Sequence, residues 1–153
     1  MYKKEYEGLA LVLEIDQGDC KVINRTVLGE RTENVTAIWD TGSPVIVISS
    51  RLAERLGCFI DYDNPHEMGS SFGYGHAYPT HIDLQLGPDY YPMVDAVVID
   101  FKTDKHYDLM LGMEMIARGT FEVDSTCGST IVTFAPIRND DGSIPITQFV
   151  RNE

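Results

Sequence analysis

The sequence predicts a mainly β protein with one or two short helices. Apolar runs of strand length recur along the chain, and Gly, Pro, Asn and Asp residues typical of turns separate them. Helix signals occur at residues 51–56 and 113–117, and both segments are short. The length of 153 residues fits one domain that buries about two-thirds of its unfolded surface. We therefore expect a single domain over residues 1–153.

The first half of the chain is expected to build strands around one short helix. In order, the pattern predicts a hairpin with strands at 8–16 and 20–28, a polar connection at 29–34, strands at 35–39 and 45–48, and the helix at 51–56. Ser49 or Ser50 can cap this helix, and Gly57 can end it. Residues 58–68 have no clear period, so their structure stays open.

The second half is expected to be mostly strands. In order, the pattern predicts a glycine-rich hairpin near 69–75, strands at 81–86 and 91–101 around a turn at 87–89, a strand at 109–111, the helix at 113–117, and strands at 120–123, 130–134 and 144–150. No second domain and no low-complexity segment interrupts this order.

The chain is strongly acidic, with a formal net charge of −12 at pH 7. This charge opposes contact with nucleic-acid phosphates, so no nucleic-acid partner is expected. No apolar run approaches the ~20 residues that a membrane helix needs, and no signal-peptide core follows the first residues. We expect a cytoplasmic protein with no membrane partner.

The cysteines and histidines show no metal-binding pattern. Cys20, Cys58 and Cys127 are widely spaced and form no Cys-x-x-Cys pair, which favours reduced, structural thiols over a disulfide or a metal. His76 and His81 are five residues apart on an expected strand and would face opposite sides. We expect no metal site and no cofactor.

One carboxylate stands in an unusual place for an aspartate. An apolar strand ends at Asp40, and Thr41, Gly42 and Ser43 then turn the chain sharply into a second apolar run. A purely structural Asp usually lies in a solvated turn or caps a helix. Because burial disfavours a lone charged carboxyl, this position makes best sense if the charge has a partner or a chemical role.

The segment from Asp40 to Ser43 resembles the active-site loop of aspartic proteases of the retroviral, or retropepsin-like, type. Residues 107–116, in which an apolar triplet precedes Gly112 and a short helix, look like the second signature of that family. The glycine-rich segment 69–75 lies between the two, where the family carries its flap. These three features occur in the order of the family and cover most of the chain.

The resemblance implies an acid-protease β-barrel that acts as an aspartic endopeptidase on peptide or protein substrates. The core would span about residues 8–135, and a C-terminal extension at 136–153 could supply a dimerisation strand. One carboxyl takes a proton from water, and a second polarises the carbonyl and protonates the leaving nitrogen. Since the chain has one Asp-Thr-Gly segment, the second carboxyl would come from Asp40 of another copy in a homodimer.

The neighbours of Asp40 would have separate roles. Gly42 lets the backbone approach, and its N–H can donate to a carboxylate. In the family, a threonine at the position of Thr41 hydrogen-bonds across the dimer axis, and the hydroxyl of Ser43 could donate to Asp40. The resemblance further implies a flap over the substrate at Ser71, Phe72, Gly73, Tyr74 and Gly75, a structural support behind the loop at Leu111 and Gly112, and an apolar lining from Ile38, Ile46 and Val47.

A second function stays open beside proteolysis. The chain could be a catalytically inactive relative that uses the same site as a peptide-binding or assembly module. Trp39 stands where small or aliphatic residues are usual, and Met113 replaces an arginine that pairs subunits in some viral enzymes. We interpret Trp39 as a core or interface anchor rather than a substrate contact.

Overall fold

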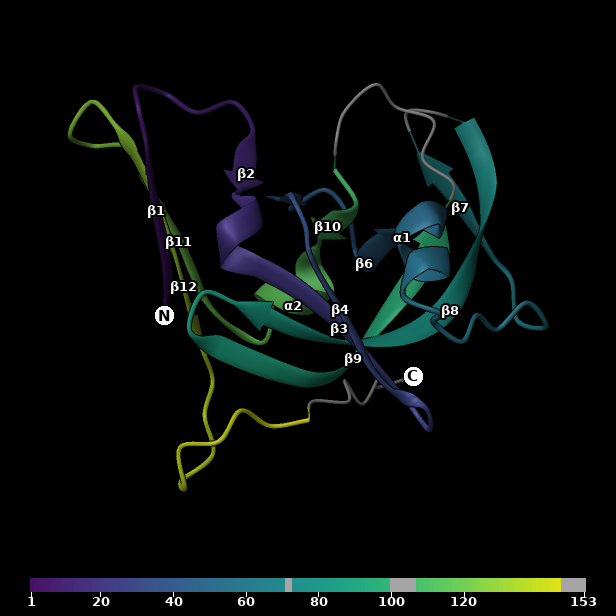
Figure 1. Cartoon of the computed structure of the whole chain (residues 1–153). Helices are drawn as coiled ribbons and strands as arrows, with labels where there is room; N and C mark the ends of the chain where they lie inside the picture. Colours follow the sequence, from purple (N-terminus) through teal and green to yellow (C-terminus); the bar gives the residue numbers. More distant parts are fainter. Residues whose placement is uncertain (71–72, 100–106, 147–153) are drawn as a thin grey trace.

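The structure, a computed structural model, describes residues 1–70, 73–99 and 107–146. Its strands form two sheets that are joined by short helices and loops (Figure 1). In chain order the elements are β1 (Tyr2–Tyr6), β2 (Leu13–Ile15), the 3-10 helix η1 (Gln17–Asp19), β3 (Cys20–Thr26), β4 (Gly29–Asn34), β5 (Ala37–Trp39), β6 (Ile46–Ser49), α1 (Ser50–Arg55), β7 (His66–Ser70), β8 (Gly73–Leu86), β9 (Asp89–Ile99), β10 (Leu109–Leu111), α2 (Met113–Ile116), β11 (Gly119–Asp124) and β12 (Thr130–Pro136).

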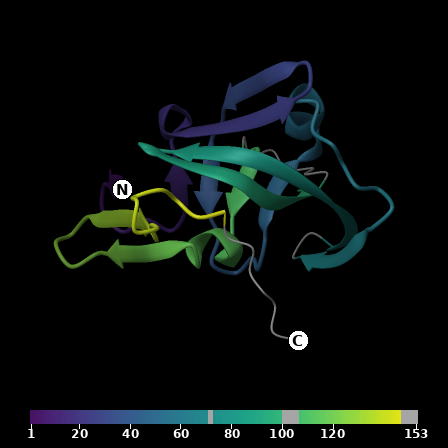
Figure 2. The same ribbon diagram turned by 90° about the horizontal axis from the view of Figure 1, so that it is seen from below.

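A large curled sheet forms the body of the molecule. Its strand order is β2-β5-β10-β6-β9-β8-β3-β4, and β7 pairs with β8. Figure 2 shows the long strands β8 and β9 curving across the molecule, with β3 and β4 on one side and the β11–β12 hairpin on the other. In the middle of the sheet, β10 pairs parallel with β5 and antiparallel with β6. This arrangement brings the strand before Asp40 beside the strand before Gly112.

A second sheet, with the order β1-β12-β11, packs against Trp39. Each of its strands supplies one aromatic ring to the indole, with ring centroids at 5.9 Å for Tyr2, 5.2 Å for Phe134 and 5.0 Å for Phe121. Trp39 is only 5% exposed. The residue before Asp40 is therefore a core anchor that ties the terminal sheet to the large sheet.

The structure confirms the mainly β fold with two short helices. The expected helix at 51–56 is α1, and Ser49 caps it by accepting a hydrogen bond from the N–H of Leu52 at 3.2 Å. Gly57 follows with a φ of +63°, which glycine adopts without strain and which ends the helix. The expected strands at 109–111, 120–123 and 130–134 are also present.

The expected hairpin at the start of the chain is wrong. β2 pairs with β5, and β3 forms its hairpin with β4, the segment expected to be a polar connection. β4 lies at the edge of the sheet and is exposed along nearly its whole length, so its sequence lacks the apolar alternation that marks a strand. β1 also lies where the sequence pattern predicts no strand.

The C-terminal extension differs from its expectation as well. Residues 144–146 form no strand, and the rest of the segment expected at 144–150 lies outside the described residues. The extension is fixed to the body by Arg138, whose guanidinium lies 2.5 Å from the buried carboxylate of Asp89. The α-amino group of Met1 lies 3.0 Å from the other oxygen of the same carboxylate.

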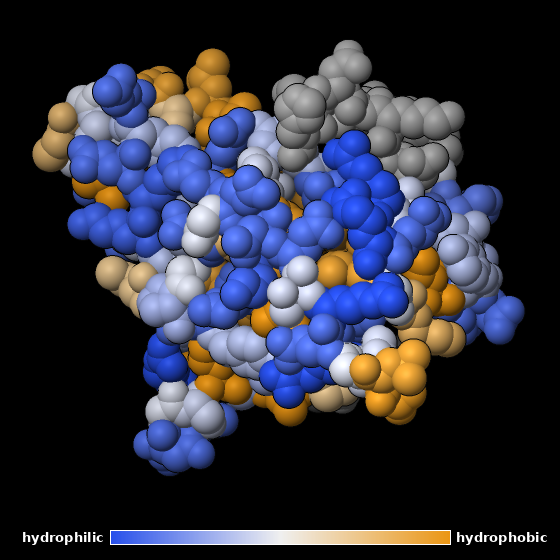
Figure 3. Space-filling model, in the orientation of Figure 1, coloured by the Kyte–Doolittle hydropathy of each residue, from blue (hydrophilic) through white to orange (hydrophobic). Residues whose placement is uncertain are grey.

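Polar side chains dominate the face seen in Figure 3. Among its hydrophobic patches, the one at lower right covers the tip of the β3–β4 hairpin, where Val27 and Leu28 are almost fully exposed. Among the described residues, no helix is long and apolar enough to cross a membrane.

A network around Asp108 fixes the start of β10. The Asp108 carboxylate accepts hydrogen bonds from Ser49 Oγ and Arg51 Nε, each at 2.7 Å, and Arg55 Nη2 lies 3.5 Å away. Burial opposes the charge of Asp108, but the hydrogen bonds from Arg51 and Ser49 and the two positive charges outweigh it and hold the pKa of Asp108 below its usual value.

Replacing Trp39 tests its role as the link between the sheets. Trp39→Ala would leave a cavity among three aromatic rings, and we expect it to lower the free energy of unfolding by about 3–5 kcal/mol. Urea denaturation followed by circular dichroism measures this loss. Val27→Ala, at an almost fully exposed site, is the control and should change stability by less than about 0.5 kcal/mol. Equal stability of the two variants would contradict the packing role.

The Asp108 network predicts a loss of stability in acid. Asp108→Asn should cost about 1–3 kcal/mol at pH 7, because Arg51 and Arg55 lose a charged partner. A carboxyl with a lowered folded pKa stabilises the fold above its unfolded pKa, near 3.9, and loses that effect as pH falls through the folded value. The difference between wild type and variant should therefore shrink below about pH 4.

Denaturation at several pH values measures this difference. Glu54→Gln removes an exposed carboxyl of α1, the helix that carries Arg51 and Arg55, and so controls for the loss of one negative charge. A difference in the free energy of unfolding between wild type and Asp108→Asn that stays constant down to pH 2 would contradict the stabilising role of the network.

Candidate active site

The loop after β5 holds the Asp40 carboxylate by backbone hydrogen bonds. The N–H of Asp40 donates to the carbonyl of Leu111 at 3.0 Å, and the N–H of Ser43 donates back to the Asp40 carbonyl at 3.1 Å. The N–H of Gly42 donates to Asp40 Oδ1 at 3.0 Å, as the sequence predicts. Asp40 is half-buried, while Thr41 and Gly42 are exposed. The carboxylate is therefore oriented by the main chain and open on one side.

Gly112 and helix α2 support this loop from behind. A Cβ atom on Gly112 would lie 2.4 Å from the Ser43 carbonyl oxygen and 2.2 Å from that of Val45, so no other residue fits without backbone movement. The first amides of α2 hold the same stretch, since the N–H of Met113 donates to the Ser43 carbonyl at 2.7 Å and that of Glu114 to the Pro44 carbonyl at 3.1 Å. Leu111 and Gly112 thus lie directly behind the Asp40 loop, at the position expected for a structural support.

The hydroxyl of Ser43 makes a different contact from the expected one. Ser43 Oγ donates to the carbonyl of Val45 at 3.1 Å, and the side chain is 9% exposed. A hydroxyl carries a single proton to donate, so this bond to the main chain takes the place of a bond to Asp40. Ser43 stabilises the turn between β5 and β6 in this structure.

The outer face of the large sheet carries apolar side chains beside the Asp40 loop. Ile38, Met110 and Val47 occupy matching register positions on β5, β10 and β6, so their side chains point to the same face, where Ile38 and Met110 are half-buried and Val47 is buried. Ile46, also expected in this lining, is fully buried in the core on the opposite face, because neighbours in a strand alternate. Met110, half-buried between two buried leucines of β10, takes its place, and no signal in the sequence identifies it because all three residues of this strand are apolar.

The glycine-rich segment forms a hairpin from β7 and β8. Their pairing runs from His66 and Ala77 to Ser70 and Gly73 at the tip. Of the expected flap residues, Ser71 and Phe72 lie outside the described residues, whereas Gly73, Tyr74 and Gly75 begin β8. The hairpin is thus confirmed, and its role as a flap stays a prediction.

The part of the chain that the structure describes holds no cluster of metal-binding side chains. Groups of three or more His, Cys, Asp or Glu side chains with metal-binding geometry are absent from residues 1–70, 73–99 and 107–146. Cys20, Cys58 and Cys127 are free thiols. Burial raises the pKa of the Cys20 thiol to about 12, as expected for a structural cysteine.

Comparison with known proteins identifies the architecture. The chain is similar to a retropepsin-like aspartic protease from Rickettsia conorii, with a TM-score of 0.55, 17% sequence identity, and coverage of 86% of this chain and 98% of that chain. It is also similar to the retroviral protease-like domain of Ddi1 from Leishmania major, with a TM-score of 0.45, 20% identity, and coverage of 84% and 97%. No family model and no curated protein matches the chain. The first of these similarities shows that the chain has the retropepsin-like fold.

Proposed function

We propose that this protein is an aspartic endopeptidase that hydrolyses peptide bonds as a homodimer. The observation that carries the proposal is the Asp40 carboxylate, oriented by the Gly42 N–H at 3.0 Å and left partly open to solvent. A carboxylate in a preorganised loop can take a proton from a water molecule and so activate it. The retropepsin-like fold supports this proposal, because the Asp40 loop and the supporting Gly112 occur in the order that the family resemblance implies.

The reaction needs a second carboxyl, and Asp40 of a second copy is the source we propose. Two carboxyls held about 3 Å apart cannot both ionise, so one stays charged and the other carries a proton. The charged member activates water, and the protonated member polarises the carbonyl and then protonates the leaving nitrogen. Thr41 is exposed next to Asp40 and is available to bond across the two-fold axis.

Exposed apolar side chains near Asp40 support the homodimer. Leu13 pairs with Trp39, so the chain enters β2 beside the Asp40 loop. In the segment just before β2, the side chains of Leu9 and Leu11 are 75% and 91% exposed. Met113, which follows Gly112, is 43% exposed. Such side chains around half of a proposed catalytic centre suit a contact between two copies.

The alternative is a catalytically inactive module that uses the same face for peptide binding or assembly. The unusual Trp39 no longer favours it, because this side chain lies in the core and away from the catalytic face. A protein that stays monomeric, or a dimer that cleaves no peptide at any pH, would favour the module.

Replacement of the proposed catalytic group gives the direct test. Asp40→Asn keeps the size of the side chain and an oxygen that can accept the Gly42 N–H, so the fold and the dimer should persist. Cleavage of an acid-pH peptide library should fall by at least about a hundredfold, because the proton acceptor is lost. Mass spectrometry of the products measures the cleavage. Retained proteolysis in this variant would refute the assignment.

The surface around Asp40 predicts which apolar residue matters for pairing. Leu11→Asp would bury a lone carboxylate in the proposed dimer contact, and we expect at least about tenfold weaker dimerisation with a parallel loss of cleavage. Leu28→Asp, at the 96% exposed tip of the β3–β4 hairpin, is the matched control and should change neither. Sedimentation velocity over a range of concentrations measures the dimerisation of both variants. A dimer that tolerates Leu11→Asp would exclude this contact.

A further inference from the structure

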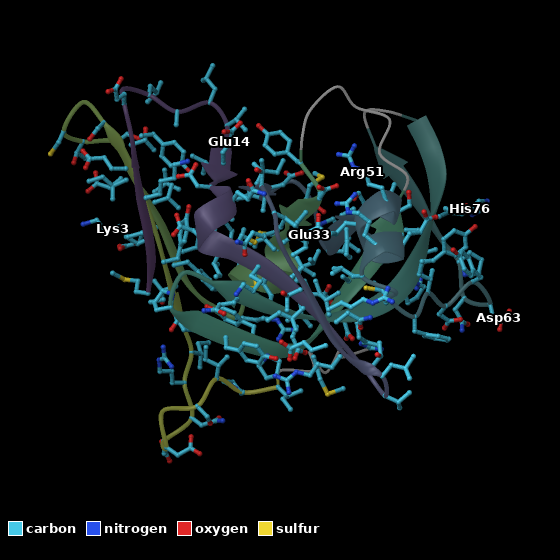
Figure 4. All side chains as sticks on the ribbon, in the orientation of Figure 1. Lys3, Glu14, Glu33, Arg51, Asp63 and His76 are labelled. Atoms are coloured by element: carbon cyan, nitrogen blue, oxygen red, sulfur yellow. The ribbon has the colours of Figure 1, made fainter. Side chains whose placement is uncertain are left out.

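The apolar row on the outer face of the large sheet ends at a carboxylate. Glu14 in β2 pairs with Ile38 in β5, and Ile38 pairs with Met110 in β10. Because paired residues point to the same face, the row runs from Glu14 through Ile38 and Met110 to Val47. Figure 4 shows Glu14 on β2, on the other side of β10 from Arg51 and α1. One end of this face is therefore acidic.

The position of Glu14 is close to the proposed catalytic group. Adjacent strands lie about 4.8 Å apart, and two residues along a strand span about 7 Å. Ile38 lies two residues before Asp40, and Glu14 lies one strand from Ile38. The backbone of Glu14 is thus on the order of 8 Å from that of Asp40. A peptide held at Asp40 would bring side chains within two or three residues of the scissile bond into reach of Glu14.

The Glu14 carboxylate is held in place by a neighbouring phenol. The Tyr107 hydroxyl donates to Glu14 Oε1 in a short hydrogen bond. Burial and this hydrogen bond raise the pKa of Tyr107 to about 12, so the phenol stays protonated and remains a donor. A carboxylate has two oxygens and about four acceptor positions, which leaves Oε2 available to a second donor.

Among the described residues, Lys4 lies near Glu14, but its charge is paired with another carboxylate. Lys4 Nζ forms an ion pair with Asp16 at 2.9 Å and donates to the main-chain carbonyl of Glu14 at 3.2 Å. Among the described residues, no cationic side chain forms an ion pair with the Glu14 carboxylate. The side chain is exposed, and the net charge of −12 adds a long-range attraction for positive ligands.

We propose that Glu14 is a specificity-determining residue that selects substrates with a Lys or Arg side chain near the scissile bond. This proposal rests on the proposed proteolytic function. An apolar substrate side chain packs over Ile38 and Met110, and a neighbouring cationic side chain pairs with Glu14. Tyr107 is a positioning residue, because it fixes the carboxylate at the edge of the apolar row.

Peptide cleavage tests the selection. The peptides share an apolar pair at the cleavage site and carry Lys or Gln at each of the three positions on either side. Wild type should cleave the Lys peptide with at least about tenfold higher kcat/KM at one position, a size expected for a charged hydrogen-bonded contact. Glu14→Gln should abolish this preference and keep cleavage of the Gln peptide. Asp63→Asn, which removes a carboxyl far from Glu14 in Figure 4, should keep the preference.

Binding to an inactive protein separates failure of this inference from failure of the proposed function. The same peptides, labelled with a fluorophore, are titrated with Asp40→Asn and with the double variant that also carries Glu14→Gln. If Asp40→Asn binds the Lys peptide more tightly than the Gln peptide and the double variant does not, the result supports the role of Glu14 even if wild type cleaves nothing. Equal affinity for both peptides, binding of neither, or cleavage that ignores the Lys side chain would overturn it.

Discussion

The packing of Trp39 is the constraint on which the rest of the structure depends. The indole fills the space between the large sheet and the three-stranded sheet, with Tyr2, Phe121 and Phe134 around it. Aromatic rings at these separations bury a large apolar area and also prefer defined mutual orientations. Trp39 directly precedes Asp40, so the position of the proposed catalytic loop is set by a sheet that contains the N-terminal strand and β12. Residues far from the loop in sequence thereby fix its place in space.

The loop itself is held by an exchange of backbone hydrogen bonds with β10 and α2. Asp40 donates to Leu111, and Met113 donates to Ser43. Buried polar groups need such partners, since each one left unpaired costs about 1–3 kcal/mol. The two segments can approach this closely only because Gly112 has no side chain to keep them apart. A loop with its main chain satisfied in this way presents the carboxylate in one orientation, which is what preorganised acid–base chemistry needs.

The sequence was sufficient for features whose signal is local, and insufficient for features that depend on register. The Asp40 loop, Gly112, the cap at Ser49 and the glycine at 57 each follow from residue types at short spacing. β4 was missed because an edge strand has little apolar surface to bury. The hydroxyl of Ser43 donates to the carbonyl of Val45, two residues away, and this local hydrogen bond takes the place of the expected bond to Asp40. Glu14 and Met110 could not be placed, because their neighbours come from strands about 24 and 72 residues away, respectively, and no pattern in one strand reveals its partner.

The register of the central strands links the stability of the fold to the chemistry of its outer face. Neighbouring side chains in β5 alternate, so the same pairing that buries Trp39 and Leu111 turns Ile38 and Met110 outward, in line with Glu14. A slip of β5 by one residue would expose the indole of Trp39, and a slip of β2 would bury the carboxylate of Glu14; both changes are strongly unfavourable. The core therefore specifies the register, and the register in turn specifies which side chains share the outer face beside the proposed catalytic group. If the proposed proteolytic function holds, substitutions on the outer face would alter the preferred substrate while the core keeps the strands aligned, so specificity would change there without loss of the fold.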